Sequence, residues 1–146
     1  MSLFQLLSVS ESGMTAQRAR AEVIVENLAN AETTRTPDGG PYKRKQVLFN
    51  TQPQASPFSA VFQTELSDAS LGVGISDVVE DERPPDMRYD PGHPHANQDG
   101  YVAFPRISPA EEMVDLLGAS RGYQANVAAI SAVKDMLSKS IDLLRA

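Results

Sequence analysis

The chain has 146 residues, of which 41% are hydrophobic, and a formal net charge of −6. That length fits one ordinary domain, or a small domain with extensions. The absence of cysteine excludes a disulfide framework and a cysteine-ligated metal site, and the negative charge argues against a nucleic-acid partner, which requires a positive face.

The positions of the prolines divide the chain into three regions. All ten lie between Pro37 and Pro109, and a proline inside a helix costs about 3 kcal/mol. The sequence therefore predicts an α+β fold with three parts. These are an N-terminal helix within residues 1–31, a small β-rich middle domain over 32–108, and a C-terminal helix within 109–146.

The first region is predicted to form a helix from Leu3 to about Ala29. Apolar residues recur every seven positions, at Leu7, Met14, Ala21 and Leu28. Ile24 and Val25 add a second apolar row beside them. A seven-residue repeat is typical of a helix that pairs with another long helix, as in a coiled coil.

The opening residues do not have the pattern of a cleaved secretory signal. The first basic residue is Arg18, and Gln5 interrupts the apolar patch near the start. No run of residues approaches the roughly 18 apolar positions that a membrane span needs. We therefore expect neither a cleaved signal nor a membrane span.

The middle region is predicted to be β-rich because β-branched and aromatic residues stand between turn signals. The expected strands cover residues 42–49, 58–64, 71–79 and 100–104. Strong turns are expected at residues 37–40 and 90–94, and a mobile loop near residues 50–60. Nine acidic residues stand against two arginines between Glu65 and Asp99.

The last region begins with Ser108-Pro109-Ala110-Glu111, which combines a capping box with proline at the first helical position. A seven-residue repeat follows at Leu116, Tyr123, Ile130, Leu137 and Leu144, with Met113, Val127 and Ile141 beside it. This seam is expected to pair with the first helix. The small residues left on the other side would admit a second subunit.

Three polar side chains of this helix, Tyr123, Gln124 and Asn126, allow two interpretations. A solvated helix face is one. The other is an interface, in which tyrosine supplies contact area and amides fix the register by hydrogen bonds.

The sequence predicts no catalytic, cofactor-binding or metal site. His93 and His95, with Asp90 and Asp99 nearby, fit a surface turn better than a metal site. The run Glu80–Glu82 is typical of a solvated charge cluster rather than a catalytic pair. Gly72 and Gly74 lack the third glycine and following helix of a dinucleotide-binding fingerprint. No nucleophile, base and orienting group assemble into an enzyme site.

Four stretches resemble the family of bacterial flagellar basal-body rod proteins. Residues 27–49, NLANAETTRTPDGGPYKRKQVLF, are similar to the rod and hook signature Asn-Leu-Ala-Asn and the turn after it. Residues 111–137 resemble the C-terminal helix with its Ser-Arg-x-Tyr-x-Ala-Asn pattern, and the opening MSLF also fits. Residues 89–105 resemble a stretch that sets the proximal rod member apart. Its specific turn consists of Tyr89, Asp90, Pro91, Gly92, His93 and Pro94.

The resemblance implies a structural subunit of the proximal rod. In that family the terminal helices form the inner tube of the rod, the middle forms an outer domain, and the rod transmits torque for motility. Subunits would be exported through the flagellar type III export apparatus and assemble in the periplasmic rod of the basal body. Expected partners are other copies, other rod proteins and the base ring of the motor.

We expect the assembly interface to use both helices. Its expected residues are Leu7, Met14, Asn27, Leu28, Asn30, Leu116, Ser120, Arg121, Tyr123, Gln124, Asn126, Ile130 and Leu137. The alternative from another class is a soluble coiled-coil adaptor, or an export-associated module, that forms no filament.

Overall fold

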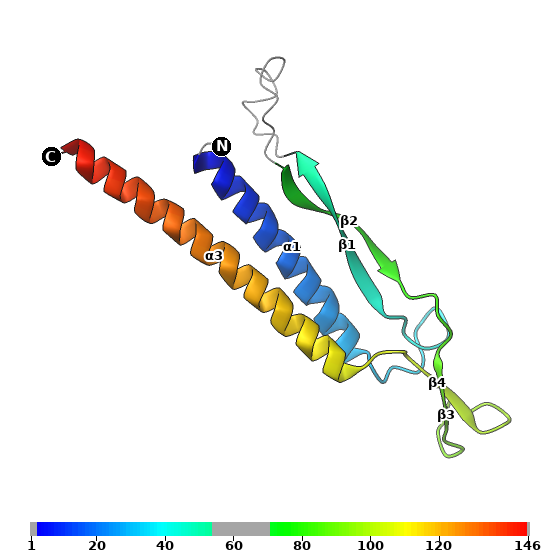
Figure 1. Ribbon diagram of the computed structural model, residues 1–146. Helices are drawn as coiled ribbons and strands as arrows, with labels where there is room; N and C mark the ends of the chain where they lie inside the picture. The colour runs from blue at the N-terminus through cyan, green and yellow to red at the C-terminus, as the bar shows by residue number, and fades with distance from the viewer. Residues whose placement is uncertain (1–2, 54–70, 146) are drawn as a thin grey trace. The chain divides into compact units, whose positions relative to one another are not determined.

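The computed structural model describes residues 3–53 and 71–145, and it shows two long helices and two small sheets (Figure 1). The helices are α1 (Leu3–Ala29) and α3 (Pro109–Arg145). The strands are β1 (Lys45–Pro53), β2 (Leu71–Glu80), β3 (Asp86–Tyr89) and β4 (Tyr101–Phe104). Strand β1 pairs with β2, and β3 pairs with β4. The predicted α+β fold, with a helix at each end and a β-containing middle, is confirmed.

The strand predictions are confirmed in part. The expected strands at 71–79 and 100–104 correspond to β2 and β4, and the one at 42–49 overlaps β1. Strand β1 continues to Pro53, so residues 50–53 are strand rather than loop, because β2 supplies a pairing partner for them. The rest of the expected loop and the expected strand at 58–64 lie outside the described residues. Strand β3 was not predicted, since its four residues form a strand only by pairing with β4.

The chain divides into two compact units. The first comprises residues 1–19, 49–76 and 119–146, and the second comprises residues 20–48 and 77–118. Each unit combines part of both helices with strand segments. The division into 1–31, 32–108 and 109–146 follows the order of helices and strands along the chain, and it remains a prediction.

In the first unit the two helices come close together at glycines. A Cβ atom placed on Gly13 would lie 2.9 Å from the Oδ1 atom of Asn126. One placed on Gly122 would lie 3.1 Å from the Cδ atom of Gln17. Since real Cβ atoms are rarely this close to a neighbour, these glycines permit an approach that larger residues would obstruct.

The covered row of α3 differs in part from the predicted seam. Buried or half-buried residues recur every seven positions at Glu112, Ala119, Asn126 and Val133. The predicted companions Met113, Val127 and Ile141 are 57%, 42% and 53% exposed, so placing them in the intramolecular seam was wrong. Of the predicted seam itself, Leu116, Ile130 and Leu137 are half-buried and Tyr123 is 42% exposed.

The repeat on α1 shows a similar pattern. Leu7, Met14, Ala21 and Leu28 are half-buried, whereas Ala16 and Ile24 are buried. Val25, which was predicted to share a row with Ile24, is 51% exposed. Neighbouring positions on a helix point about 100° apart, so one of the two faces away when the other is covered.

Strand β2 lies against α1 in the first unit. The backbone N–H of Val73 donates a hydrogen bond to Ser12 Oγ at 3.1 Å, and Gly72 and Gly74 on either side of it are buried. A Cβ on Gly74 would overlap the Gln52 side chain, 2.2 Å from its Cδ atom. The glycine pair therefore has a packing explanation, in that it lets a strand approach its neighbours closely.

The β3–β4 hairpin belongs to the second unit and carries the family-specific turn. It is antiparallel, with Asp86 opposite Phe104 and Tyr89 opposite Tyr101. Gly100 has φ of 80°, and a Cβ there would lie 2.9 Å from the ring of Tyr89. Glycine at this position therefore provides both the backbone conformation and the room for the tyrosine.

Replacing Gly13 with leucine tests the close helix contact. We expect Gly13→Leu to lower the free energy of unfolding by about 1 kcal/mol or more, because overpacking outweighs the gain in helix propensity. The matched control is Gly118→Leu on α3, where a Cβ would meet nothing within 4 Å. Urea unfolding followed by circular dichroism should show that Gly118→Leu leaves the free energy of unfolding unchanged or raises it. Equal effects of the two variants on this free energy would contradict this account.

Candidate functional site

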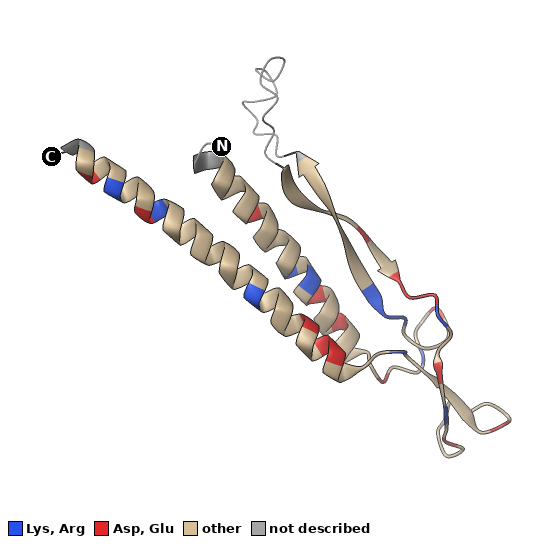
Figure 2. Ribbon diagram, in the orientation of Figure 1, with Lys and Arg blue, Asp and Glu red and all other residues tan. Residues whose placement is uncertain are grey.

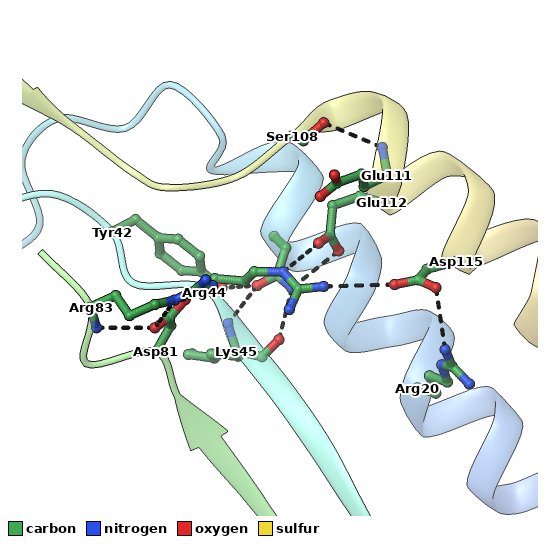
Figure 3. Close-up of polar contacts among 11 residues, drawn as sticks. Arg20, Tyr42, Arg44, Lys45, Asp81, Arg83, Ser108, Glu111, Glu112 and Asp115 are labelled. Carbon is green, nitrogen blue, oxygen red and sulfur yellow. Dashed lines mark hydrogen bonds and ion pairs between the residues drawn. The ribbon is translucent and has the colours of Figure 1, made fainter. Parts of the chain in front are cut away.

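A cluster of polar side chains lies where the end of α1, the start of β1 and the first turn of α3 meet, all within the second unit (Figure 3). We call it the polar junction, and it consists of Asn27, Tyr42, Arg44, Lys45 and Glu112. Asn27 and Glu112 are each 1% exposed. Polar groups buried to this degree stabilise a fold only when their hydrogen bonds are satisfied.

Asn27 uses the full hydrogen-bonding capacity of its amide. Its Nδ2 group donates to the carbonyl of Lys45 at 2.8 Å and to Glu112 Oε2 at 3.3 Å. Its Oδ1 atom accepts from the Tyr42 hydroxyl at 3.1 Å and from the Lys45 backbone N–H at 2.9 Å. One helical side chain therefore pairs with both backbone groups of the first residue of β1.

Glu112 joins the same cluster from α3. Its Oε1 atom accepts from Arg44 Nε at 2.6 Å, and the Arg44 side chain is only 18% exposed. Arg44 also lies 3.6 Å from Asp115, which lies 3.4 Å from Arg20 of α1. This chain of charges links α1, the residue before β1 and α3. Only the Arg44–Glu112 pair is largely buried, and breaking a buried pair of this kind costs about 3–5 kcal/mol.

The electrostatic setting of Tyr42 favours its neutral form. Burial raises the pKa of its hydroxyl well above the usual value, and the negative charge of Glu26 raises it further. The Glu26 carboxylate also pairs with Lys45 Nζ at 2.6 Å. The hydroxyl therefore stays a donor to Asn27 under ordinary conditions.

The cap predicted at the start of α3 is present. Ser108 Oγ accepts from the Glu111 backbone N–H at 3.5 Å, and the Ser108 carbonyl accepts from the Glu112 N–H at 3.0 Å. Pro109 occupies the first helical position, where its missing N–H has no cost. The cap fixes the turn from which Glu112 reaches the polar junction.

The predicted interface residues fall into two groups. Those half-buried or buried within the chain are Leu7, Met14, Asn27, Leu28, Asn30, Leu116, Asn126, Ile130 and Leu137. Ser120, Arg121, Tyr123 and Gln124 are exposed. Of the polar members, Asn30 bonds the Glu26 carbonyl of its own helix, and Asn126 bonds the Gly122 carbonyl.

The family-specific turn is held by contacts with residues beside it. Tyr89 packs edge-on against Tyr101 at a centroid distance of 5.3 Å. His93 Nδ1 accepts from the His95 backbone N–H at 3.1 Å, and His95 Nδ1 lies 2.8 Å from Thr34 Oγ1. These contacts give both histidines a local role within the turn.

Helix α3 exposes many large apolar side chains. We call these the exposed apolar set: Met113, Val114, Leu117, Tyr123, Val127, Met136, Ile141 and Leu143, which are 42–80% exposed. From Gly122 to Val133 the helix has no charged residue, and the middle of α3 carries neither charge colour in Figure 2. A helix of this composition is normally covered by other helices.

Comparisons with known proteins decide the family. A family described as flagella basal body rod protein matches residues 7–35, and one described as flagellar basal body rod FlgEFG protein C-terminal matches residues 98–143. The flagellar basal-body rod protein FlgC of Bacillus subtilis is 41% identical, across 98% of this chain and 99% of that protein. The FlgC proteins of Borreliella burgdorferi and Escherichia coli O157:H7 are 37% and 40% identical, over 99% and 98% of both chains.

The chain belongs to the flagellar basal-body rod protein FlgC family. It is a structural subunit of the proximal rod in the basal body and not an enzyme. None of the helices in the described ranges has the length and apolarity needed to cross a membrane.

The polar junction contains residues whose roles sequence reasoning missed. Asn27 was assigned to the assembly interface, but its partners Tyr42, Lys45 and Glu112 were not recognised, and neither was the pairing of Arg44 with Glu112. The sequence offered one clue to the position of Glu112, because this residue lies in the same seven-residue row as Ala119. It offered no clue to the role of Arg44, because the partner Glu112 lies 68 positions away in sequence.

Replacing Asn27 with alanine tests the polar junction. The change would leave Glu112, Tyr42 and the first residue of β1 without partners, so we expect the free energy of unfolding to fall by about 2–4 kcal/mol. The matched control is Asn30→Ala in the same Asn-Leu-Ala-Asn stretch. Its amide bonds only nearby groups, and we expect a loss of about 1 kcal/mol or less. Similar losses in urea unfolding would contradict the role of Asn27.

The raised pKa of Tyr42 predicts a loss of stability in alkaline solution. The pKa of Tyr42 is higher in the folded protein than in the unfolded chain. Its contribution to the free energy of unfolding is therefore complete below the unfolded pKa of about 10, and it is lost as pH rises above that value. Thermal unfolding measured from pH 8 to pH 11 should show a steeper decline in the wild type than in Tyr42→Phe. Tyr101→Phe, which alters an exposed tyrosine, should behave like the wild type. A decline unchanged by Tyr42→Phe would exclude this explanation.

Proposed function

We propose that the chain builds the rod by packing the exposed apolar set of α3 against neighbouring rod subunits. Family membership supports assembly with other rod proteins. The distribution of side chains supports this surface in particular, because the members of the exposed apolar set are 42–80% exposed within the chain. Large apolar residues gathered on an exposed surface are typical of interaction sites.

The half-buried and exposed members of the predicted interface would act differently. Tyr123 and Gln124 are exposed and could contact another subunit directly, as the interface interpretation requires. Asn27 and Asn126 are engaged within the chain, so they would act indirectly by fixing the helices that carry the interface.

The partners and mechanical role form part of the same proposal. The subunit would contact other copies, other rod proteins and the base ring of the motor. It would reach the periplasmic rod through the flagellar type III export apparatus and transmit torque to the hook. A stiff connection between helices and strands suits that role, and the Arg44–Glu112 pair with the hydrogen bond from Asn27 to Glu112 would provide one.

The soluble adaptor alternative has no comparable support. An adaptor that forms no filament would not need large apolar side chains such as Tyr123 and Val127 of the uncharged stretch to remain exposed. Family membership also favours the rod.

Introducing a charge into the exposed apolar set tests the proposal. Leu117 is 52% exposed, so Leu117→Asp should change the free energy of unfolding of the isolated subunit by about 0.5 kcal/mol or less. In the cell it should abolish rod assembly and swimming, because the carboxylate would be buried without a partner between subunits. Lys139→Asp places the same side chain at an already charged, exposed position of α3 and should retain motility. Normal swimming of the Leu117→Asp strain would refute the proposed surface.

A further inference from the structure

The start of β2, which lies in the first unit, turns its large side chains away from the rest of that unit. The buried positions are the two glycines, Gly72 and Gly74. The residues that alternate with them are Leu71, Val73 and Ile75, which are 61%, 38% and 38% exposed. A sheet with one packed face normally buries its apolar side chains and presents polar ones to water. In this strand the order is reversed.

Strand β1 adds an aromatic side chain to the exposed face. A Cβ atom on Gly74 would lie 2.2 Å from the Cδ atom of Gln52, so Gln52 lies on the glycine face of the sheet. Side chains alternate between the two faces along a strand, so Phe49, three positions before Gln52, lies on the opposite face. Phe49 is 38% exposed.

The four apolar residues form one surface, which we call the outer sheet face: Phe49, Leu71, Val73 and Ile75. None of the residues 49–53 and 71–76 carries a charge. Clustered apolar side chains of this kind are typical of a surface that another element covers. The lack of charge indicates that the covering surface is apolar as well.

Helix α3 carries a surface of the same composition. Its stretch from Gly122 to Val133 contains no charged residue, and it exposes Tyr123 and Val127, each to 42%. This stretch belongs to the first unit, as the outer sheet face does. Every copy of the chain therefore presents both surfaces on one compact unit.

The position of the chain in a rod decides between two ways of covering these surfaces. A contact that uses the same surface on both copies is two-fold and ends at a dimer. A contact between two different surfaces joins copies head to tail, and it continues into a helical filament when it does not close. A structural subunit of the rod needs contacts of the second kind.

We propose that the outer sheet face of one copy docks on the uncharged stretch of α3, residues 122–133, in a second copy. A helix packed on a sheet lets both elements bury an apolar face. This inference rests on the proposed function, because it names what covers part of the exposed apolar set. It adds that the β1–β2 sheet is the other half of that contact.

Cross-linking between copies tests the contact directly. The chain contains no cysteine, so introduced thiols react without background. One strain would express a Val73→Cys copy together with a Val127→Cys copy, and its isolated basal bodies would be treated with a short bismaleimide. We expect a cross-linked dimer that neither variant gives alone. The control pair, Val73→Cys with Lys139→Cys, places the second thiol outside residues 122–133 and should give no dimer.

A charge on the outer sheet face provides a second test. Leu71 is 61% exposed, so Leu71→Asp should leave the urea midpoint of the isolated subunit almost unchanged. In the cell it should abolish swimming, because the carboxylate would be buried without a partner against α3 of the next copy. Ser76→Asp lies on the same strand, at an exposed position of the opposite face, and should retain swimming.

Three results would overturn the inference. A dimer formed by Val73→Cys alone would make the sheet of a second copy the occupant. Cross-links from Val73→Cys only to another protein would assign the face to a subunit of different sequence. Normal swimming of Leu71→Asp would show that the face stays uncovered. If Leu117→Asp still stops swimming in that case, the α3 surface stands and only the sheet contact fails.

Discussion

Asn27 is buried, and its amide is hydrogen-bonded on both sides, to the start of β1 and to Glu112 at the start of α3. Without these partners its burial would destabilise the protein, so the positions of three segments distant in sequence depend on one another. Arg44 strengthens the arrangement by pairing with Glu112, and Tyr42 completes the amide's hydrogen bonds. Within the second unit, these polar contacts attach the start of β1 to both helices.

The two helices distribute side chains in a way that suits a component of a larger structure. Small residues such as Gly13, Ala16 and Ala119 occupy the covered positions, whereas residues as large as Leu117 and Tyr123 are exposed. A protein that functions alone would gain more by burying the large side chains, since burial of a leucine stabilises by about 1.5–3 kcal/mol. Under the proposed function, that gain would come from contacts between subunits. A rod assembled by such contacts would resist bending if its joints were packed like a protein interior.

The charged residues of the second unit differ in what they contribute to stability. Buried and half-buried pairs, such as Arg44 with Glu112, connect segments of the fold. Exposed pairs such as Arg83 with Asp81 contribute less, because solvent screens their charges. The Arg83 guanidinium, by hydrogen bonding, lowers the pKa of Asp81 to about 2, so this carboxylate remains charged throughout the physiological range.

The two helices, their ends, the cap at Ser108 and the family could be predicted from the sequence. Prolines, seven-residue repeats and capping residues act locally, so their effects follow from the order of residues along the chain. The covered row of α3 could not be predicted, because a repeat gives the spacing of apolar side chains but not the distance between helices. The buried cluster shared by Asn27, Arg44 and Glu112 could not be predicted either. Their pairing joins residues up to 85 positions apart, and no local rule specifies such a partner.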